Sequence, residues 1–262
     1  HYESVEQFQM SNGLFDYAVM QYYPEGNLKQ LLAAKTLQLN EKFAIINGIL
    51  QGITFLHQNH IIHRDIKPSN ILMALDSRGN YIPKIADFGL SKSIYESDLS
   101  NITNSFGGGT LDYSSPEQLY GHPLRPNTDL WSFGVITYEV FTGKKPFSSE
   151  DISGSPEAKR RDIYQKIVHA HLPADIDDCP VPYGDVIRLC LIKDPKQRVK
   201  KGEDLIAFLK NPVPLIIPEE SYDEDETLIL GKEKETEKEI NPIEIFRKGA
   251  AAILGKPVQI SP

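Results

Sequence analysis

The feature of the sequence that most constrains its fold is a polar loop of eight residues, His63 to Asn70, held between two apolar segments. Residues 61–62 precede the loop and residues 71–73 follow it, and all five are Ile, Leu or Met. The loop carries a carboxylate, an amide and two cations, and the triplet Asp-Phe-Gly follows at residues 87–89. The loop is therefore a candidate site.

The polar residues of this region are the types that phosphoryl transfer needs. The reaction requires a group that accepts the proton of the attacking hydroxyl, oxygen ligands for Mg²⁺, and positive charge near the transferred phosphoryl group. Asp65 can accept the proton, and Lys67 can supply the positive charge. Asn70 and Asp87 can be the metal ligands, because Mg²⁺ binds a few hard oxygen atoms together with substrate phosphates.

Hydrophobic periodicity predicts that the chain is mainly helical from residue 25 onward. Asn27 can cap a short helix, and Asn40 can cap a longer one that ends around residues 57–60. Residues 129–141 are apolar almost all round, which is typical of a buried central helix. Two further amphipathic helices are expected at residues 185–192 and 203–209.

Extended structure is expected in two places. Residues 14–23 are rich enough in aromatic and β-branched residues for a strand, which the following Pro-Glu-Gly triplet ends. Residues 84–86 are typical of a short strand before Asp87. Residues 91–115 are rich in Ser, Thr, Asn and Gly, which predicts a long loop. Loops of this length inside compact domains are usually functional or disordered.

Separate motifs occur in an order that resembles the eukaryotic-type protein kinases, specifically their large helical lobe. They are the polar loop at 63–70, Asp-Phe-Gly at 87–89, Ser-Pro-Glu at 115–117, Asp-Leu-Trp-Ser-Phe-Gly at 129–134 and Asp-Pro-Lys-Gln-Arg at 194–198. The resemblance covers roughly residues 8–211. It implies a fold that is α+β by family and mainly α here: a protein-kinase-like large helical lobe with the hinge strand and only a remnant of the small lobe.

The resemblance implies a role for each polar residue by its position. Asp65 is expected to be the catalytic base, and Lys67 to contact the γ-phosphate. Asn70 and Asp87 are expected to bind Mg²⁺. Thr110 is expected to bridge Asp65 and Lys67 through its hydroxyl.

Other residues are expected to support the loop. Asp129 should hold it through backbone hydrogen bonds, and Arg198 should pair with Glu117. Arg64 could form a salt bridge within the loop, or it could read a phosphate on residues 100–110, a segment dense in Ser and Thr.

Three histidines near the loop, His57, His60 and His63, could suggest a metal cluster. Helix-end capping is the favoured interpretation for His57 and His60, and buried support under the phenylalanine of Asp-Phe-Gly for His63. Cys190 lies on an apolar helix face and is expected in the core.

ATP and Mg²⁺ are the cofactors that the resemblance implies. Met20 corresponds to the gatekeeper, and the Gln21 carbonyl and Tyr23 amide correspond to the groups that read adenine. Leu72 corresponds to the residue under the adenine ring. Because backbone groups read the adenine, side-chain identity at these hinge positions constrains binding little.

The resemblance further implies a serine/threonine protein kinase whose partner is a protein substrate with a Ser or Thr acceptor. Lys67, two residues after Asp65, resembles the Ser/Thr class, as does Gly109-Thr110. The alternative is a catalytically inactive kinase-like scaffold or regulatory module that binds partners through the large lobe. The intact set of Asp65, Lys67, Asn70 and Asp87 favours the enzyme.

The chain departs from the family pattern before the hinge. Residues 1–13 contain neither a GxGxxG loop nor a lysine. Either the chain is a piece of a larger kinase, or it is a natural variant without a small lobe; His1 as first residue favours the piece. We therefore expect the chain alone to have negligible kinase activity.

The net charge of −8 comes almost entirely from one segment. Residues 219–239 hold ten acidic residues and three lysines, and 3 − 10 gives −7. Three prolines between residues 212 and 218 mark the change in composition. The shift predicts a folded region over residues 1–211 and an acidic, disordered tail over residues 212–262. The resemblance implies that the folded region is a partial protein kinase domain with the last small-lobe strands, the hinge and the large lobe.

Composition also excludes several classes of protein. An acidic chain is a poor candidate for non-specific nucleic-acid binding, and no apolar run is long enough for a membrane span. The two cysteines, Cys179 and Cys190, match no zinc-binding spacing. They suggest a reducing compartment, so we expect an intracellular, cytoplasmic protein. No pattern in the sequence sets an oligomeric state.

Overall fold

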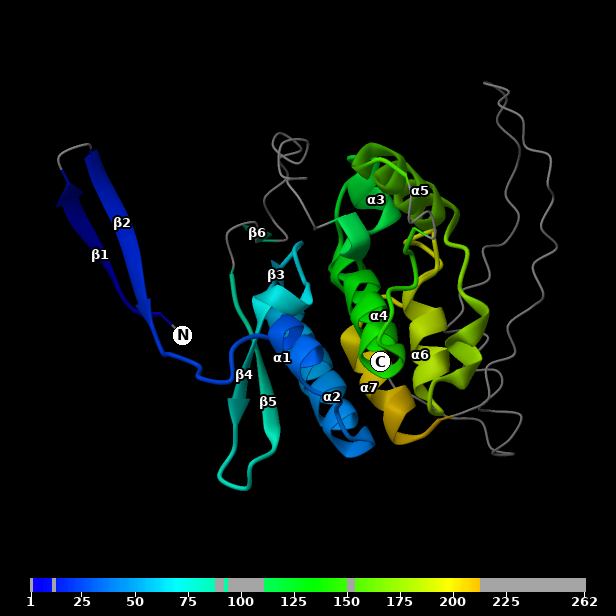
Figure 1. The fold of residues 1–262 in the computed structure, drawn as a ribbon, viewed down its shortest axis with the longest axis horizontal. Helices are drawn as coiled ribbons and strands as arrows, with labels where there is room; N and C mark the ends of the chain where they lie inside the picture. Colours follow the sequence, from blue (N-terminus) through cyan, green and yellow to red (C-terminus); the bar gives the residue numbers. More distant parts are fainter. Residues whose placement is uncertain (1, 11–12, 88–91, 94–110, 150–153, 213–262) are drawn as a thin grey trace, which may run out of the picture.

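The fold is that of a computed structural model, which describes residues 2–10, 13–87, 92–93, 111–149 and 154–212. Helices dominate these residues, and the strands form small antiparallel pairs (Figure 1). This agrees with the expected large helical lobe that retains a hinge strand. The predicted acidic tail from residue 213 onward lies outside the described residues.

The chain begins with a β-hairpin that stands apart from the helices (Figure 1). Strand β1 (Tyr2–Met10) pairs antiparallel with β2 (Gly13–Met20), with Phe8 opposite Phe15 in the register. The strand expected at 14–23 is therefore confirmed, although it ends at Met20. Its partner β1 was not predicted.

A short segment joins the hairpin to the helices. The Tyr23 carbonyl accepts a hydrogen bond from the Gly26 amide at 3.1 Å, and Gly26 adopts a φ of +71° that suits glycine. The Gly26 carbonyl accepts from the Met73 amide at 2.9 Å, and Asn27 forms a β-bridge with Leu72. These bonds fix the segment to the strand that follows the polar loop.

Helix α1 (Leu28–Ala34) begins where the sequence predicts. The Asn27 side chain accepts from the Gln30 amide, and the Gln30 side chain accepts from the Asn27 amide, both at 3.0 Å. This reciprocal pair is a capping box.

Helix α2 (Leu39–Gln58) begins earlier than predicted, because the capping residue is Gln38 and not Asn40. The Glu41 carboxylate accepts from the Gln38 amide at 2.7 Å, which satisfies one of the free amides at the start of the helix. The apolar stripe of α2 is buried, as at Ile46 and Leu50.

Two short strand pairs frame the polar loop. Strand β3 (Ile61–Ile62) pairs with β6 (Lys92–Ser93), and β4 (Ile71–Leu75) pairs with β5 (Tyr81–Ile85). A 3₁₀ turn, η1 (Pro68–Asn70), ends the loop. Strand β5 packs on α2, where a Cβ at Gly48 would lie 2.6 Å from Pro83 Cγ. The strand predicted at 84–86 is the end of β5.

The remaining helices include the three that the sequence predicts. These are α4 (Pro126–Thr142), α6 (Tyr183–Cys190) and α7 (Gly202–Lys210). The elements that were not predicted are η2 (Leu111–Tyr113), α3 (Pro116–Leu119), α5 (Pro156–His169) and η3 (Ala174–Asp178).

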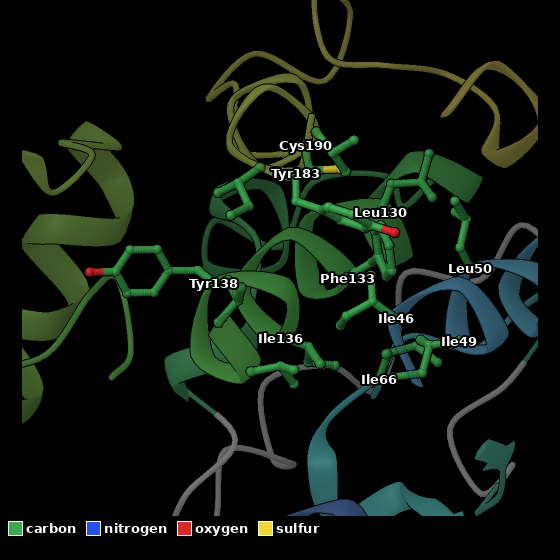
Figure 2. Packing of buried hydrophobic residues seen from close by; sticks show 14 of the residues in the cluster. Ile46, Ile49, Leu50, Ile66, Leu130, Phe133, Ile136, Tyr138, Tyr183 and Cys190 are labelled. Atoms are coloured by element: carbon green, nitrogen blue, oxygen red, sulfur yellow. The ribbon is translucent and has the colours of Figure 1, made fainter. Parts of the chain in front are cut away.

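Helix α4 is the centre of the core (Figure 2). Leu130 and Phe133 of α4 pack among side chains of α2 and α6, including Leu50 and Cys190. Cys190 is fully buried, which confirms its predicted place in the core. Burial on every side fixes the position of α4, and with it the position of Asp129 in its first turn.

Candidate active site

Asp129 holds the backbone of the polar loop. Its Oδ2 accepts a hydrogen bond from the His63 amide at 2.9 Å, and its Oδ1 accepts from the Arg64 amide at 2.8 Å. Asp129 is almost fully buried, and Arg64 adopts a φ of +71°. The expected backbone contact is thus present, and it fixes the residue directly before Asp65 in an uncommon conformation.

His57 is a supporting residue that the sequence analysis misassigned. Its Nε2 lies 2.9 Å from Asp129 Oδ2, so His57 contacts the residue that holds the loop and does not cap α2. Because an ionised carboxylate only accepts hydrogen bonds, we assign the ring proton to Nε2. The three histidines form no metal site, since the described part of the chain contains no group of three or more His, Cys, Asp and Glu side chains that could hold a metal ion.

The two oxygens of the Asp65 carboxylate have different surroundings. Oδ2 accepts from Lys67 Nζ at 2.7 Å and from Asn70 Nδ2 at 3.0 Å. Asn70 Nδ2 also donates to the Asp65 carbonyl at 2.9 Å. Oδ1 is buried and has no hydrogen-bond partner among the described residues. One oxygen thus fixes the side chain, and the other can accept a proton.

Asn70 and Asp87 are brought together by strand pairing. The Ala86 amide donates to the Asn70 carbonyl at 2.9 Å, and the pairing of Ile71 with Ile85 continues from it. Asp87 follows directly, exposed and with a φ of +64°. His63 is fully buried and its Nε2 lies 3.0 Å from the Ala86 carbonyl. The phenylalanine at position 88 lies outside the described residues.

This donor set fits Mg²⁺. Asn70 uses its Nδ2 on Asp65, which leaves the harder Oδ1 as its ligand atom, and Asp87 adds a carboxylate at the surface. Two protein oxygens are enough for Mg²⁺, because it keeps waters and binds substrate phosphates as well.

The expected adenine-binding groups lie on the segment after β2. Met20 is the last residue of that strand, Gln21 is exposed and Tyr23 is partly exposed. Leu72 is partly buried in β4, and its bridge to Asn27 brings it near this segment. Thr110, expected to bridge Asp65 and Lys67, lies outside the described residues, as does the Ser/Thr-rich segment 100–110.

Glu117 and Arg198 form the expected pair in the core. Arg198 Nη1 and Nη2 donate to the two Glu117 carboxylate oxygens at 2.6 and 2.9 Å, and both side chains are buried. Arg198 also lies 5.0 Å from the centre of the Trp131 ring. Burial acts to raise the pKa of Glu117, but the hydrogen bonds and charge of Arg198 outweigh it and lower the pKa.

Comparison with known families agrees with the resemblance described above. The family model described as the protein kinase domain matches residues 6–206. The chain belongs to the protein kinase family. The matched region holds all the site residues described above.

The curated relatives of this kinase domain are protein kinases by name, and two of the three that follow are named serine/threonine kinases. A probable serine/threonine-protein kinase of Clostridium acetobutylicum is 31% identical over 77% of the chain and 29% of its own length. An SNF1-related protein kinase catalytic subunit alpha of Arabidopsis thaliana is 34% identical, over 71% of the chain and 35% of its own length. The serine/threonine-protein kinase PknB of Mycobacterium tuberculosis is 31% identical, over 83% of the chain and 34% of its own length. The chain therefore spans about a third of the length of these relatives.

Two contacts of the kinase site were not predicted, namely His57 with Asp129 and Gln118 with the Arg64 carbonyl at 2.8 Å. Both join segments that are far apart in the sequence. The Ser-x-x-Gln spacing of Ser115 and Gln118 is the pattern of a capping box and could have indicated a cap. No sequence signal indicates the contact with the loop.

Proposed function

We propose that the protein containing this chain is a serine/threonine protein kinase that transfers the γ-phosphate of ATP to a protein hydroxyl, with Mg²⁺ as the metal. The observation that carries the proposal is the asymmetric Asp65 carboxylate. Its Oδ2 is fixed by Lys67 and Asn70, and its Oδ1 has no partner in the described part of the chain. A general base needs an oxygen that no donor already occupies, so that it can take up the proton.

Each residue of the chain then has a defined task. Asp65 Oδ1 accepts the proton of the substrate hydroxyl, which orients the oxygen for attack. Lys67, 2.7 Å from Asp65, places its positive charge where the transferred group passes. Asn70 and Asp87 would hold Mg²⁺, which when bound neutralises charge on the phosphates. The Gln21 carbonyl and the Tyr23 amide are the proposed adenine contacts, with Leu72 beneath the ring.

Two observations support the choice of acceptor and compartment. Lys67 stands two residues after Asp65, as expected for the Ser/Thr class, and two of the relatives described above carry serine/threonine kinase names. The acceptor that we propose is therefore Ser or Thr. Cys179 and Cys190 are both free and buried, which fits a reducing compartment, and we propose a cytoplasmic location. Among the described residues, no helix combines the length and apolar character that spanning a bilayer requires.

The test is single-turnover phosphoryl transfer by the complete natural polypeptide that contains this chain. Wild type should transfer radiolabelled phosphate to a generic Ser/Thr substrate. Asp65→Asn should lose about 10²–10⁴-fold in rate with little change in ATP affinity, because the base acts on the hydroxyl and not on the nucleotide. Asp162→Asn, on the surface of α5, is the matched control. Equal rates for wild type and Asp65→Asn would refute the assignment. An inactive wild type that still folds would favour the scaffold alternative.

A further inference from the structure

Gln118 connects two parts of the site. It is almost fully buried in the first turn of α3. Its Oε1 accepts from the Ser115 amide at 3.0 Å and from Ser115 Oγ at 3.2 Å, which caps the helix. Its Nε2 donates to the Arg64 carbonyl at 2.8 Å. Capping explains the first contacts but not the last one, which reaches the catalytic loop.

The Arg64 carbonyl belongs to the peptide group that leads directly into Asp65. The amide on the other side of Arg64 donates to Asp129 Oδ1 at 2.8 Å. Asp129 and Gln118 therefore hold the two peptide groups around a residue with a φ of +71°. A left-handed non-glycine residue persists only when its surroundings hold it. If the contact with Gln118 is lost, the peptide group between Arg64 and Asp65 can rotate, and the Asp65 side chain moves with it.

Segment 111–119, which contains Gln118, is itself held to α4 by hydrogen bonds. Ser132 Oγ of α4 donates to the Tyr113 carbonyl at 2.8 Å, and the Tyr113 hydroxyl donates to Glu139 Oε2 at 2.7 Å. Burial and the Glu139 carboxylate raise the pKa of Tyr113, so its hydroxyl keeps its proton. The seam between this segment and the loop leaves no space for a water molecule.

We propose that Gln118 is a positioning residue that couples segment 111–119 to the catalytic base Asp65. The inference rests on the proposed kinase function, because it assigns to Gln118 the orientation of the base. Segment 111–119 directly follows Thr110 and the Ser/Thr-rich loop. Its position would therefore be transmitted through the Gln118 amide to the peptide group before Asp65.

The chain offers a matched control in Gln30. It occupies the same position in the capping box of α1, where its Oε1 accepts from the Asn27 amide at 3.0 Å, and it is exposed. Gln118→Met and Gln30→Met thus remove the same amide from two capping boxes, and only the first removes a contact with the loop.

The experiment measures kcat, the KM for ATP and their pH dependence in the complete natural polypeptide. Gln118→Met should lower kcat about tenfold or more and change the KM for ATP less than about twofold, because a buried carbonyl loses its partner far from the adenine contacts. Gln30→Met should keep the wild-type kcat. Gln118→Glu should recover toward wild type as the pH falls, since a protonated carboxyl can donate to the Arg64 carbonyl and an ionised one repels it. The Met variant should show no such recovery.

Amide hydrogen exchange supplies a readout that needs no activity. Peptides covering residues 62–67 should exchange faster in Gln118→Met than in wild type or Gln30→Met. An active wild type with an unchanged kcat in Gln118→Met would overturn the proposal. So would a Gln118→Glu variant that keeps the wild-type kcat at every pH, because its carboxylate still caps the helix and the loss in Gln118→Met would then come from capping alone. An inactive wild type would refute the proposed function, and the exchange result would then decide separately whether Gln118 holds the loop.

Discussion

At the scale of single residues, the backbone conformation around the site is unusual. Arg64 and Asp87 have φ values of +71° and +64°, although neither is glycine. Such conformations cost about 1–3 kcal/mol each and persist where the surrounding structure holds them. The Arg64 amide donates to Asp129 and the Arg64 carbonyl accepts from Gln118, and the pairing of Ala86 with Asn70 holds the chain before Asp87. Arg64 directly precedes Asp65, the proposed base, and Asp87 is itself a proposed metal ligand.

The first prediction concerns the proposed metal ligand. Asp87→Ala in the complete natural polypeptide should remove most of the rise in melting temperature that MgATP produces, because one of two ligand oxygens and a full charge are lost. Asp87→Asn should give an intermediate shift, since Asn tolerates a positive φ and keeps one oxygen. A thermal-shift titration measures both. A full shift in the Ala variant would show that Asp87 is not a ligand.

The second prediction concerns the buried ion pair. Glu117→Gln should lower the free energy of unfolding by about 3–5 kcal/mol, because it leaves Arg198 buried without a counter-charge. Lys144→Met is the control: it breaks the Lys144–Asp175 pair, whose side chains are 71% and 34% exposed. That change should cost less than about 1 kcal/mol. Urea unfolding at pH 7 measures both, and equal losses would contradict the expectation.

The same pair predicts a dependence on pH. Arg198 lowers the pKa of Glu117 below its ordinary 4.5 despite burial. A carboxyl with a lowered folded-state pKa stabilises fully above its unfolded-state pKa, and the contribution is lost as the pH falls through the folded-state value. The stability gap between wild type and Glu117→Gln should therefore stay constant from neutral pH to about 5 and shrink below about 4.5. A gap that widens on acidification would contradict this sign.

At the scale of secondary-structure elements, prediction succeeded where apolar spacing was strong. The buried helix expected at 129–141 is α4, and the helices expected at 185–192 and 203–209 are α6 and α7. Prediction failed where an element depends on a capping hydrogen bond or on pairing with another strand. The start of α2 depends on Glu41 capping Gln38, a bond to the backbone that periodicity does not reveal.

Two missed elements have different physical causes. Helix α5 is mostly polar and buries only Ile167 and Val168, so its periodicity is weak. Strand β1 is defined by its pairing with β2, the other arm of the same hairpin, and its own residues alone do not predict that pairing. The same reasoning applies to the site. Motif spacing indicated Asp65, Lys67 and Asn70, but the contacts of His57 and Gln118 depend on how distant segments pack.

The third prediction concerns the contact between α4 and α6. A Cβ at Gly134 would lie 2.5 Å from Cys190 Cβ, a distance that real Cβ atoms essentially never show. Gly134→Ala should therefore lower stability by about 1–3 kcal/mol, although Gly→Ala in a helix interior normally favours the helix. Urea unfolding measures the change.

Cys190→Gly tests the cause of this loss, because it removes the opposing Cβ. In the Gly134→Ala background it should restore part of the stability, so that the double variant is less destabilised than the sum of the single changes. A strictly additive result would show that the two positions do not collide.

At the scale of the whole molecule, the described residues supply one side of the proposed ATP site. Asp65, Asn70 and Asp87 lie on the helical body. Residues 1–28 contain no Lys or Arg and no GxGxxG loop to contact the phosphates from the other side. Phosphoryl transfer depends mainly on positioning and electrostatics. A triphosphate bound by the helical body alone would stay hydrated and mobile.

The fourth prediction follows for the 262-residue chain by itself. Purified chain with radiolabelled ATP, MgCl₂ and a generic Ser/Thr substrate should give no turnover above an Asp65→Asn blank. ATP binding should be weak at best. Turnover clearly above the blank would show that this chain is self-sufficient and that other residues contact the phosphates.

The segment between β2 and α1 has a consequence for proteolysis. Tyr22 is 82% exposed and lies outside regular secondary structure, between the separate hairpin and the bonds that fix Gly26 to β4. A protease that cuts after aromatic residues should therefore cleave here early. One cut would place Met20 and Gln21 on one fragment and the polar loop on the other. Limited chymotrypsin digestion would thus divide the proposed nucleotide site while leaving the helical body whole.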